Sequence, residues 1–488
     1  MARPETLVAD DAARRIFLLA LLMALLCLVG LAIGYNEKVQ LLAVVAVLMV
    51  CVGFMAARYP WFAVGLPLFV FADIGIGVST GIIIAGINLN LIDLLVIPAL
   101  VPTVIRIAMG HRALVRPDLS VWLLLIVVGA ATVFGFYYQN DPAVIRNEVH
   151  ALMYIFLGFF WAGTELRTRK DLRNLLLLLI IVTAVAGLKA IVLSITGTVV
   201  GDQNLLQTAD ISSDQLGGTR TILAGGDTFF VTTVPLLAAI AIFYRGKTVF
   251  LWVLAAAVPI SAGMLVSLTR TNWVASIVSA LLVIVLAIRS RGLQSLKIAT
   301  LIVISSAIAV MLVSALYPIT DNYSFVDLIE RRVSFDPNEG SGTLDYRIME
   351  GKALLAVAQK HLLLGNGFGY RYSYIDYKGL MITNWSHDGF LFILLKAGIV
   401  GLALFLLAMI RTIMKSIIIA WRARDSLFAG VGLGMSMALL SLLLMSLLVN
   451  RISSLEGSYF IGLAMAVPVI LAKMAGTDDA QAEKARVT

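Results

Sequence analysis

Long apolar stretches separated by short polar ones make up most of the chain. Each stretch has the roughly 20 residues that a helix needs to cross the hydrocarbon core of a bilayer. The pattern predicts about fourteen membrane-spanning helices, at 16–34, 39–57, 61–79, 89–107, 119–137, 149–165, 174–195, 228–244, 249–267, 272–288, 298–316, 387–410, 427–449 and 455–473. The first stretch follows Arg14 and Arg15 as a signal peptide would. Because it is too long and lacks a small-residue cleavage site, we expect a retained helix.

Two polar segments, 196–227 and 317–385, interrupt the pattern. Within 343–364 of the longer segment, apolar residues recur at helical spacing and polar residues fall largely between them: Leu344, Ile348, Leu355 and Leu362 against Arg347, Lys352 and Gln359. The spacing predicts an amphipathic helix that lies on the outer membrane surface.

Three alternating glycines, Gly365, Gly367 and Gly369, follow this helix. Glycine permits left-handed backbone conformations, so we expect these residues to end the helix in tight turns. A phosphate-binding loop has a similar glycine content. Here no Lys-Ser or Lys-Thr follows and no strand is predicted before the glycines, which argues against a nucleotide site.

Composition and charge refine this interpretation. Of 488 residues, 60% are hydrophobic and 14% are charged, and the mean hydropathy is +0.96, which indicates an all-α polytopic integral membrane protein. Lys and Arg collect in alternate loops, and the positive-inside rule then places both termini in the cytoplasm. The segment 317–385 is cationic yet external, which the rule allows for long translocated loops. The net charge of +8 forms no stripe with interleaved aromatics, so we expect no nucleic-acid partner.

The topology divides the chain into four regions. These are N-terminal membrane helices at 1–248 with the external loop 196–227, a core at 249–411 with the external loop 317–385, C-terminal helices at 412–475 and a disordered cytoplasmic tail at 476–488. The tail is polar and lacks an apolar face, which is typical of disordered segments.

His387 is the sharpest candidate for chemistry. It begins an apolar helix at the external interface and is followed by Asp388. A histidine in this place can accept a proton from a hydroxyl near neutral pH, which suits a general base. The alternative is a histidine at the membrane interface whose ring only donates a structural hydrogen bond to a backbone carbonyl of the loop.

Arg270 lies between two apolar helices with almost no connecting loop, so its charge is held at the external boundary. A guanidinium group binds phosphate through two hydrogen bonds and stays charged when partly desolvated. The alternative is a helix-end arginine that extends toward water. Arg220 and Arg347 are further candidates for the same anion, and each could instead pair with a local carboxylate such as Asp227 or Glu350.

The other titratable residues give weaker signals. His111, His150 and His361 have no carboxylate or second histidine at ligand spacing in the sequence, so no metal site is predicted. Four charged residues fall within or beside predicted spans: Asp73, Asp93, Glu165 and Lys189. Structural hydrogen bonding is the expected role of each, and a polar path for a substrate is the alternative.

Over 249–411 the chain resembles the O-antigen ligase and polysaccharide polymerase superfamily of bacterial inner-membrane glycosyltransferases. Ligases of this family show a histidine, then Asn, Ser or Arg, nine residues, a glycine, two residues and a small residue. Here His387 is followed by Asp388, and Gly398 and Gly401 stand at the family spacing. Asp388 departs from the usual residue. The Ser-x-x-Arg element ending at Arg270 and the Arg347 helix leading into the glycines are also similar to the family pattern.

The resemblance implies a donor glycan linked through diphosphate to undecaprenol on the periplasmic face of the inner membrane. The glycan would move to an acceptor hydroxyl without a metal, nucleotide sugar or other cofactor. On this basis His387 acts on the acceptor, Asp388 orients it or a sugar, and Arg270, Arg220 and Arg347 bind the diphosphate. The partners would be the lipid-linked oligosaccharide donor, a glycan acceptor and membrane lipid, with a flippase and a chain-length regulator as further partners.

The acceptor separates two activities within the family. A polysaccharide polymerase is favoured, because about fourteen spans and a large external loop exceed the more compact plan of a ligase that transfers to lipid A core. A flippase or transporter is the alternative from another class. Such a carrier should show related halves and charges at the membrane midplane, whereas the distinctive charges here gather at the external boundary.

Overall fold

The computed structural model describes residues 37–72, 82–84, 87–89, 91–196, 226–244, 247–267, 269–292, 296–316, 337–376 and 379–487. Most of these residues form helices: α2 (Glu37–Arg58), α3 (Pro60–Phe71), α4 (Leu91–Ala108), α5 (Leu119–Tyr137), α6 (Pro142–Glu165), α7 (Arg169–Thr196), α10 (Gly226–Phe243), α11 (Lys247–Val266), α12 (Arg270–Arg291), α13 (Leu296–Leu316), α15 (Pro337–Ala358), α16 (Gly389–Arg422), α17 (Ser426–Met445) and α18 (Leu455–Val487). A short 3-10 turn, η2 (Gln359–His361), follows α15.

Within the described ranges, eight helices are long and apolar enough to cross a membrane, and shorter apolar helices accompany them. The eight are α5, α6, α7, α10, α12, α16, α17 and α18. The fold is therefore that of an α-helical polytopic membrane protein, as predicted. The predicted spans from 39–57 onward each overlap a helix, whereas the span 16–34 and Arg220 lie outside the described residues.

Glycines allow close packing between helices of the bundle. A side chain at Gly158 of α6 would meet the Tyr459 carbonyl, and one at Gly462 of α18 would meet the Ile155 carbonyl. Lipid tails are as apolar as the side chains, so the hydrophobic effect does not hold membrane helices together. Close van der Waals packing does, and small residues allow the backbones to come close enough for it. The Tyr459 hydroxyl donates to the Val64 carbonyl of α3 at 2.6 Å, so α6, α18 and α3 form one packed unit.

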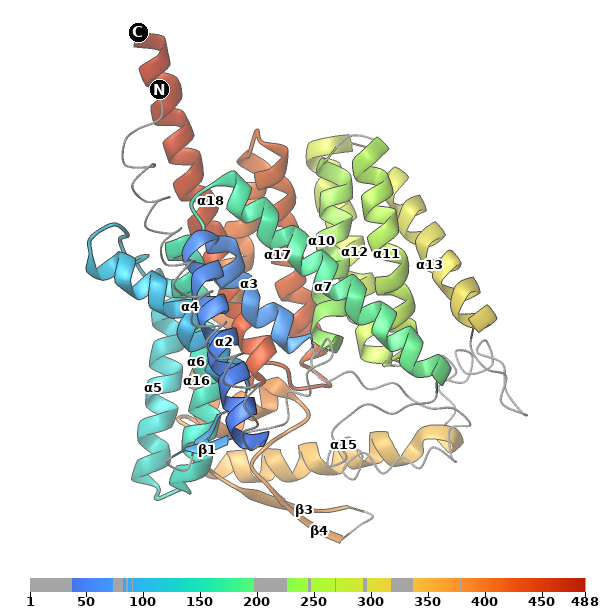
Figure 1. Ribbon diagram of the computed structural model, residues 1–488. Helices are drawn as coiled ribbons and strands as arrows, with labels where there is room; N and C mark the ends of the chain where they lie inside the picture. The colour runs from blue at the N-terminus through green and yellow to red at the C-terminus, as the bar shows by residue number, and fades with distance from the viewer. Residues whose placement is uncertain are drawn as a thin grey trace.

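Helix α15 crosses one end of the bundle, and a hairpin of β3 (Tyr372–Asp376) and β4 (Gly379–Thr383) lies beyond it (Figure 1). The strands are antiparallel, with Tyr372 opposite Thr383. A second hairpin joins β1 (Ile82–Ile84) to β2 (Ile87–Leu89). Neither hairpin was predicted. Strands of three to five residues are too short to show a clear alternation of apolar and polar residues in the sequence.

Helix α15 begins and ends about two turns earlier than the predicted range 343–364. The predicted separation of its faces is also absent. Ile348, Lys352, Leu355 and Gln359 are all exposed, since steps of three and four residues keep them on one side of the helix. The face that packs against the protein carries Glu350, Leu354 and Ala358 instead.

The glycine segment fits into a break in α16. Gly398 has φ 69° and ψ −173°, which interrupts the helix, and Gly365, Gly367 and Gly369 also have positive φ. Backbone groups freed at the break bond to the segment before it: Asn366 N donates to Leu395 O (2.9 Å), Gly367 N to Lys396 O (3.0 Å) and Ile399 N to Leu362 O (2.8 Å). The predicted tight turns are confirmed, and they join the end of α15 to the middle of α16.

Two predicted boundaries differ from the structure. Helix α16 continues to Arg422, so the boundary drawn at 411 falls inside a helix. The tail 476–488 was predicted to be disordered, but α18 continues to Val487. Its Ala, Gln, Glu, Lys and Arg residues have high helix propensity and can extend a helix that is already nucleated in the bundle.

Candidate functional site

Asp388 is the N-cap of α16. Its Oδ1 accepts hydrogen bonds from Phe390 N (2.8 Å) and Leu391 N (3.0 Å), two amides that have no partner inside the helix. Burial raises the pKa of the Asp388 carboxyl, and the nearby Glu350 carboxylate raises it further, while the two amide bonds act in the opposite direction. The cap fixes where α16 starts and so places the preceding residue, His387.

Glu350 of α15 is the carboxylate partner of His387. Its Oε2 lies 2.9 Å from His387 Nδ1, with 30% of the histidine side chain exposed and 4% of the glutamate side chain. Its Oε1 accepts from the His387 amide at 3.3 Å. In the sequence, Glu350 was considered only as a local partner for Arg220 or Arg347. No sequence signal connected it with His387, because the two residues come from different elements.

Tyr372 of β3 supports this carboxylate. Its hydroxyl lies 2.9 Å from Glu350 Oε1 and 2.9 Å from the Trp385 carbonyl. Burial raises the pKa of the Tyr372 hydroxyl, and the Glu350 carboxylate raises it further, so the hydroxyl keeps its proton and acts as a donor. Glu350 is therefore held from two sides, which fixes the orientation of the His387 ring.

The geometry assigns distinct roles to the two ring nitrogens of His387. A carboxylate can only accept hydrogen bonds, so the proton in the contact with Glu350 belongs to Nδ1. In a neutral ring Nε2 is then the nitrogen with a free lone pair, and it can accept a hydrogen bond or a proton. The Trp385 ring packs edge-on against the imidazole, with 4.6 Å between ring centroids. Together these contacts fix the orientation of the imidazole beside an aromatic surface.

Arg270 is the first residue of α12 and neighbours a buried polar cluster. Asp227 of α10 accepts from Asn272 Nδ2 at 2.8 Å and from the Arg451 guanidinium at 3.4 Å. Arg451 also bonds to Glu456 at 2.9 Å. The sequence offered Asp227 as a local partner for Arg220 or Arg347, and in the described residues it is paired with Arg451. Arg451 lies in a loop that had no assigned role.

The loop between α17 and α18 links this cluster to His387. Its Ser446 carbonyl accepts from Gly389 N at 2.7 Å, next to Asp388. A few residues later its Arg451 reaches Asp227. One short loop thus contacts the first turns of α16 and α10, and Asn272 places the first turn of α12 beside them. Arg270 and His387 consequently lie at the same end of the bundle, and half-buried Arg347 lies one turn before Glu350 on α15.

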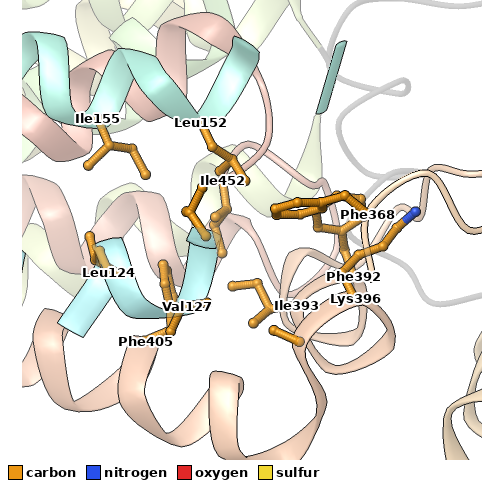
Figure 2. Close-up of a pocket in the computed structure, with 12 residues that line it drawn as sticks. Leu124, Val127, Leu152, Ile155, Phe368, Phe392, Ile393, Lys396, Phe405 and Ile452 are labelled. Carbon is orange, nitrogen blue, oxygen red and sulfur yellow. The ribbon is translucent and has the colours of Figure 1, made fainter. Parts of the chain in front are cut away.

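A small apolar cavity lies beside the break in α16. It has a volume of about 20 Å³ and is lined by Leu124, Val127, Val128, Leu152, Ile155, Phe368, Phe392, Ile393, Lys396, Ala397, Phe405 and Ile452. Figure 2 shows the Lys396 amine directed away from these apolar side chains. A space of this size holds about one water molecule, so this cavity is not a lipid site.

The remaining polar candidates form local pairs. His150 Nε2 lies 2.9 Å from Asp93 Oδ1, which also accepts from the Tyr154 hydroxyl at 2.5 Å. Glu165 accepts from Arg106 at 2.9 Å. Hydrogen bonding was the expected role for Asp93 and Glu165, and the structure shows these bonds. Across the described residues, no group of three or more His, Cys, Asp or Glu side chains is arranged to hold a metal ion.

Comparison with known proteins relates the sequence around this site to one family. A family model described as O-antigen ligase matches residues 255–406. Residues 255–406 are thus similar in sequence to the O-antigen ligase family. This region contains Arg270, Arg347, Glu350, His387 and Asp388, together with Gly398 at the break. The O-antigen ligase match supports glycan transfer of the ligase or polymerase type, and hence a membrane glycosyltransferase of bacterial polysaccharide biosynthesis.

Two other comparisons add no functional argument. No curated protein matches the chain significantly. A chain from a solved structure, "Structural coordination of polymerization and crosslinking by a peptidoglycan synthase complex", is 18% identical, with 72% of this chain and 97% of that chain covered and a TM-score of 0.37. A likeness at this level carries no inference about activity.

Proposed function

We propose that the protein is a polysaccharide polymerase that transfers a glycan from undecaprenyl diphosphate to a hydroxyl of an acceptor sugar at the periplasmic face of the inner membrane. The observation that carries the proposal is the His387–Glu350 pair at the start of α16, inside the O-antigen ligase region. In this topology both termini lie in the cytoplasm.

In the proposed reaction His387 acts as the general base. The acceptor hydroxyl oxygen attacks the anomeric carbon of the donor glycan, a new glycosidic bond forms, and the bond from that carbon to the diphosphate oxygen breaks. The hydroxyl proton moves to His387 Nε2, and the bonding electrons leave with undecaprenyl diphosphate. Glu350 stabilises the imidazolium through Nδ1, as a carboxylate does in other oriented histidine bases.

The arginines supply positive charge for the departing diphosphate. Arg270 and Arg347 are the described candidates, and Arg220 is a third that lies outside the described residues. Guanidinium groups form charge-assisted, bidentate hydrogen bonds with phosphate oxygens. Donors already in place where negative charge develops on the leaving diphosphate lower the activation barrier of transfer. The proposed reaction uses neither a metal ion nor a nucleotide cofactor, because the lipid diphosphate is already an activated leaving group.

The acceptor is proposed to be another lipid-linked glycan, which makes the enzyme a polymerase of exopolysaccharide, capsule or O-antigen. Support comes from the large module of α15 and the β3–β4 hairpin at the site end of the bundle (Figure 1). Such a module offers surface to a second sugar chain. A flippase that supplies the donor and a chain-length regulator are the proposed partners.

Reconstitution tests the proposal directly. Purified protein in liposomes is given undecaprenyl-diphosphate-linked oligosaccharide without nucleotide. We expect longer lipid-linked glycan and release of undecaprenyl diphosphate, both lost in His387→Ala protein that still inserts. Transfer only when lipid A core is added would identify an O-antigen ligase instead. Movement of the donor across the bilayer without new bonds would identify a transporter and overturn the proposal.

A further inference from the structure

Lys396 and Glu148 form an ion pair in the interior of the bundle that the proposed chemistry does not use. Lys396 Nζ lies 2.8 Å from Glu148 Oε1, and the two side chains are 1% and 7% exposed. Desolvating two charges is costly, and an ionisable residue inside a membrane helix is rare without a specific role. Both residues were missed in the sequence, because Lys396 stands inside an apolar run and Glu148 at the edge of one.

The pair binds the segments that surround the break in α16. Lys396 Nζ also donates to the Tyr370 carbonyl at 2.8 Å, and its own backbone carbonyl accepts from Gly367 N at 3.0 Å. Glu148 Oε2 accepts from Gly369 N at 2.8 Å. Helices α6 and α16 and the glycine segment therefore meet at one pair of charges.

A third bond to Glu148 leads toward the site. Asn384 Nδ2 donates to Glu148 Oε1 at 2.9 Å, and Asn384 stands three residues before His387. The next carbonyl, that of Trp385, lies 2.9 Å from the Tyr372 hydroxyl that supports Glu350. The path from the ion pair to the base thus consists of hydrogen bonds and one short stretch of chain.

We propose that Lys396 and Glu148 are positioning residues for His387: the ion pair anchors Asn384 and thereby sets the place of the segment 384–388 above the break in α16. The inference rests on the proposed function of His387. Neither residue of the pair is assigned contact with the reacting atoms. Their contribution is geometric, and a displacement of about 1 Å at a reacting group can cost about 100-fold in rate.

Kinetic variants test this inference, with undecaprenyl-diphosphate-linked oligosaccharide as donor and protein in nanodiscs. Asn384→Ala removes the link and leaves the ion pair in place, and Lys396→Met removes the charge that balances Glu148. For both we expect turnover per folded molecule to fall by about 10- to 100-fold. The donor concentration at half-maximal rate should stay unchanged, because the diphosphate is bound by arginines elsewhere.

Glu165→Gln is the matched control. Glu165 is a second buried carboxylate on α6, paired with Arg106 at 2.9 Å, and it lies about 25 Å along the helix from Glu148. We expect this variant to lower the melting temperature while leaving turnover per folded molecule unchanged. Should Lys396→Met yield too little folded protein, Asn384→Ala decides alone. Wild-type turnover in Asn384→Ala would overturn the inference.

Hydrogen exchange gives a readout that does not depend on the reaction. Exchange in a peptide covering 384–391 should accelerate in Asn384→Ala and Lys396→Met and remain at the wild-type rate in Glu165→Gln. Unchanged exchange in all three variants would show that the pair does not hold this segment. Absence of turnover in wild-type protein would count against the proposed function, whereas the exchange pattern would still decide whether the pair positions His387.

Discussion

Glu350 and His387 are 37 residues apart in the chain, yet Glu350 Oε2 lies 2.9 Å from His387 Nδ1. Helix α15 carries the carboxylate across the end of the bundle, and the cap at Asp388 fixes the histidine at the start of α16. The contact orients the imidazole and leaves Nε2 as the ring nitrogen that faces away from Glu350, which is the atom proposed to accept the proton.

Removing the charge of Glu350 should slow transfer. We expect Glu350→Gln to reduce turnover at least about 100-fold, since a positioned and stabilised general base contributes on the order of 10² to 10⁴. The measurement is release of undecaprenyl diphosphate from the lipid-linked donor. Tyr372→Phe, which removes one bond to Glu350 Oε1, should have a smaller effect. Equal rates for wild type and Glu350→Gln would show that this carboxylate does not assist the histidine.

Arg270 should contribute charge at the diphosphate. We expect Arg270→Ala to lose about 2–4 kcal/mol of transition-state stabilisation, the value typical of one donor at a developing oxyanion. Arg270→Lys should recover part of the activity, because it keeps the charge but not the bidentate geometry. Arg289, near the other end of α12 and over the Trp421 ring at 4.7 Å, is the control. Similar losses in Arg270→Ala and Arg289→Ala would indicate a general effect on the helix.

Gly398 should be irreplaceable at the break. A side chain there would meet Leu363 O and Gly365 N at a φ of +69°. We expect Gly398→Ala to lower the melting temperature strongly. The backbone at φ 69° and ψ −173° is in a region that essentially only glycine adopts and costs another residue on the order of 1–3 kcal/mol, and the collision adds to that cost. Gly110→Ala is the comparison variant, because Gly110 also has a positive φ, +73°, but nothing lies within 4 Å of an added Cβ. A melting temperature for Gly398→Ala no lower than that for Gly110→Ala would mean that the close approach is relieved easily.

Asp388 should make stability depend on pH. Its raised pKa means that the folded state holds this proton to higher pH than the unfolded state. The free energy of unfolding therefore contains a contribution from Asp388 that is complete below the ordinary Asp pKa, about 4. This contribution is lost as the pH rises through the raised pKa of the folded protein. Asp388→Asn keeps the helix cap and should remove that decline. Melting temperatures measured across this range test it, and parallel curves for the two proteins would contradict the assignment.

The sequence predicted the local features of this protein well. Helices at 119–137 and 228–244 follow from apolar runs of spanning length, which depend only on nearby residues. The turns at Gly365, Gly367 and Gly369 follow from the conformational freedom of glycine. His387, Asp388 and Arg270 stood out because each interrupts or borders an apolar run.

Features that depend on distant contacts were missed. Glu350 and Tyr372 become partners of His387 only when α15 folds over the bundle. Lys396 is hidden in an apolar run, and its partner Glu148 is more than 200 residues away. The prediction for the faces of α15 was wrong. It placed apolar Leu355 and charged Lys352 on opposite faces, although residues three positions apart lie on the same side of a helix.

A structure of the protein with undecaprenyl-diphosphate-linked oligosaccharide bound would show directly whether Arg270 and His387 face one donor site. We expect diphosphate oxygens within hydrogen-bonding distance of the Arg270 guanidinium, with His387 Nε2 facing the side from which an acceptor hydroxyl approaches the anomeric carbon. A donor bound at the opposite end of the bundle, or a packed wall of side chains between Arg270 and His387, would contradict this expectation.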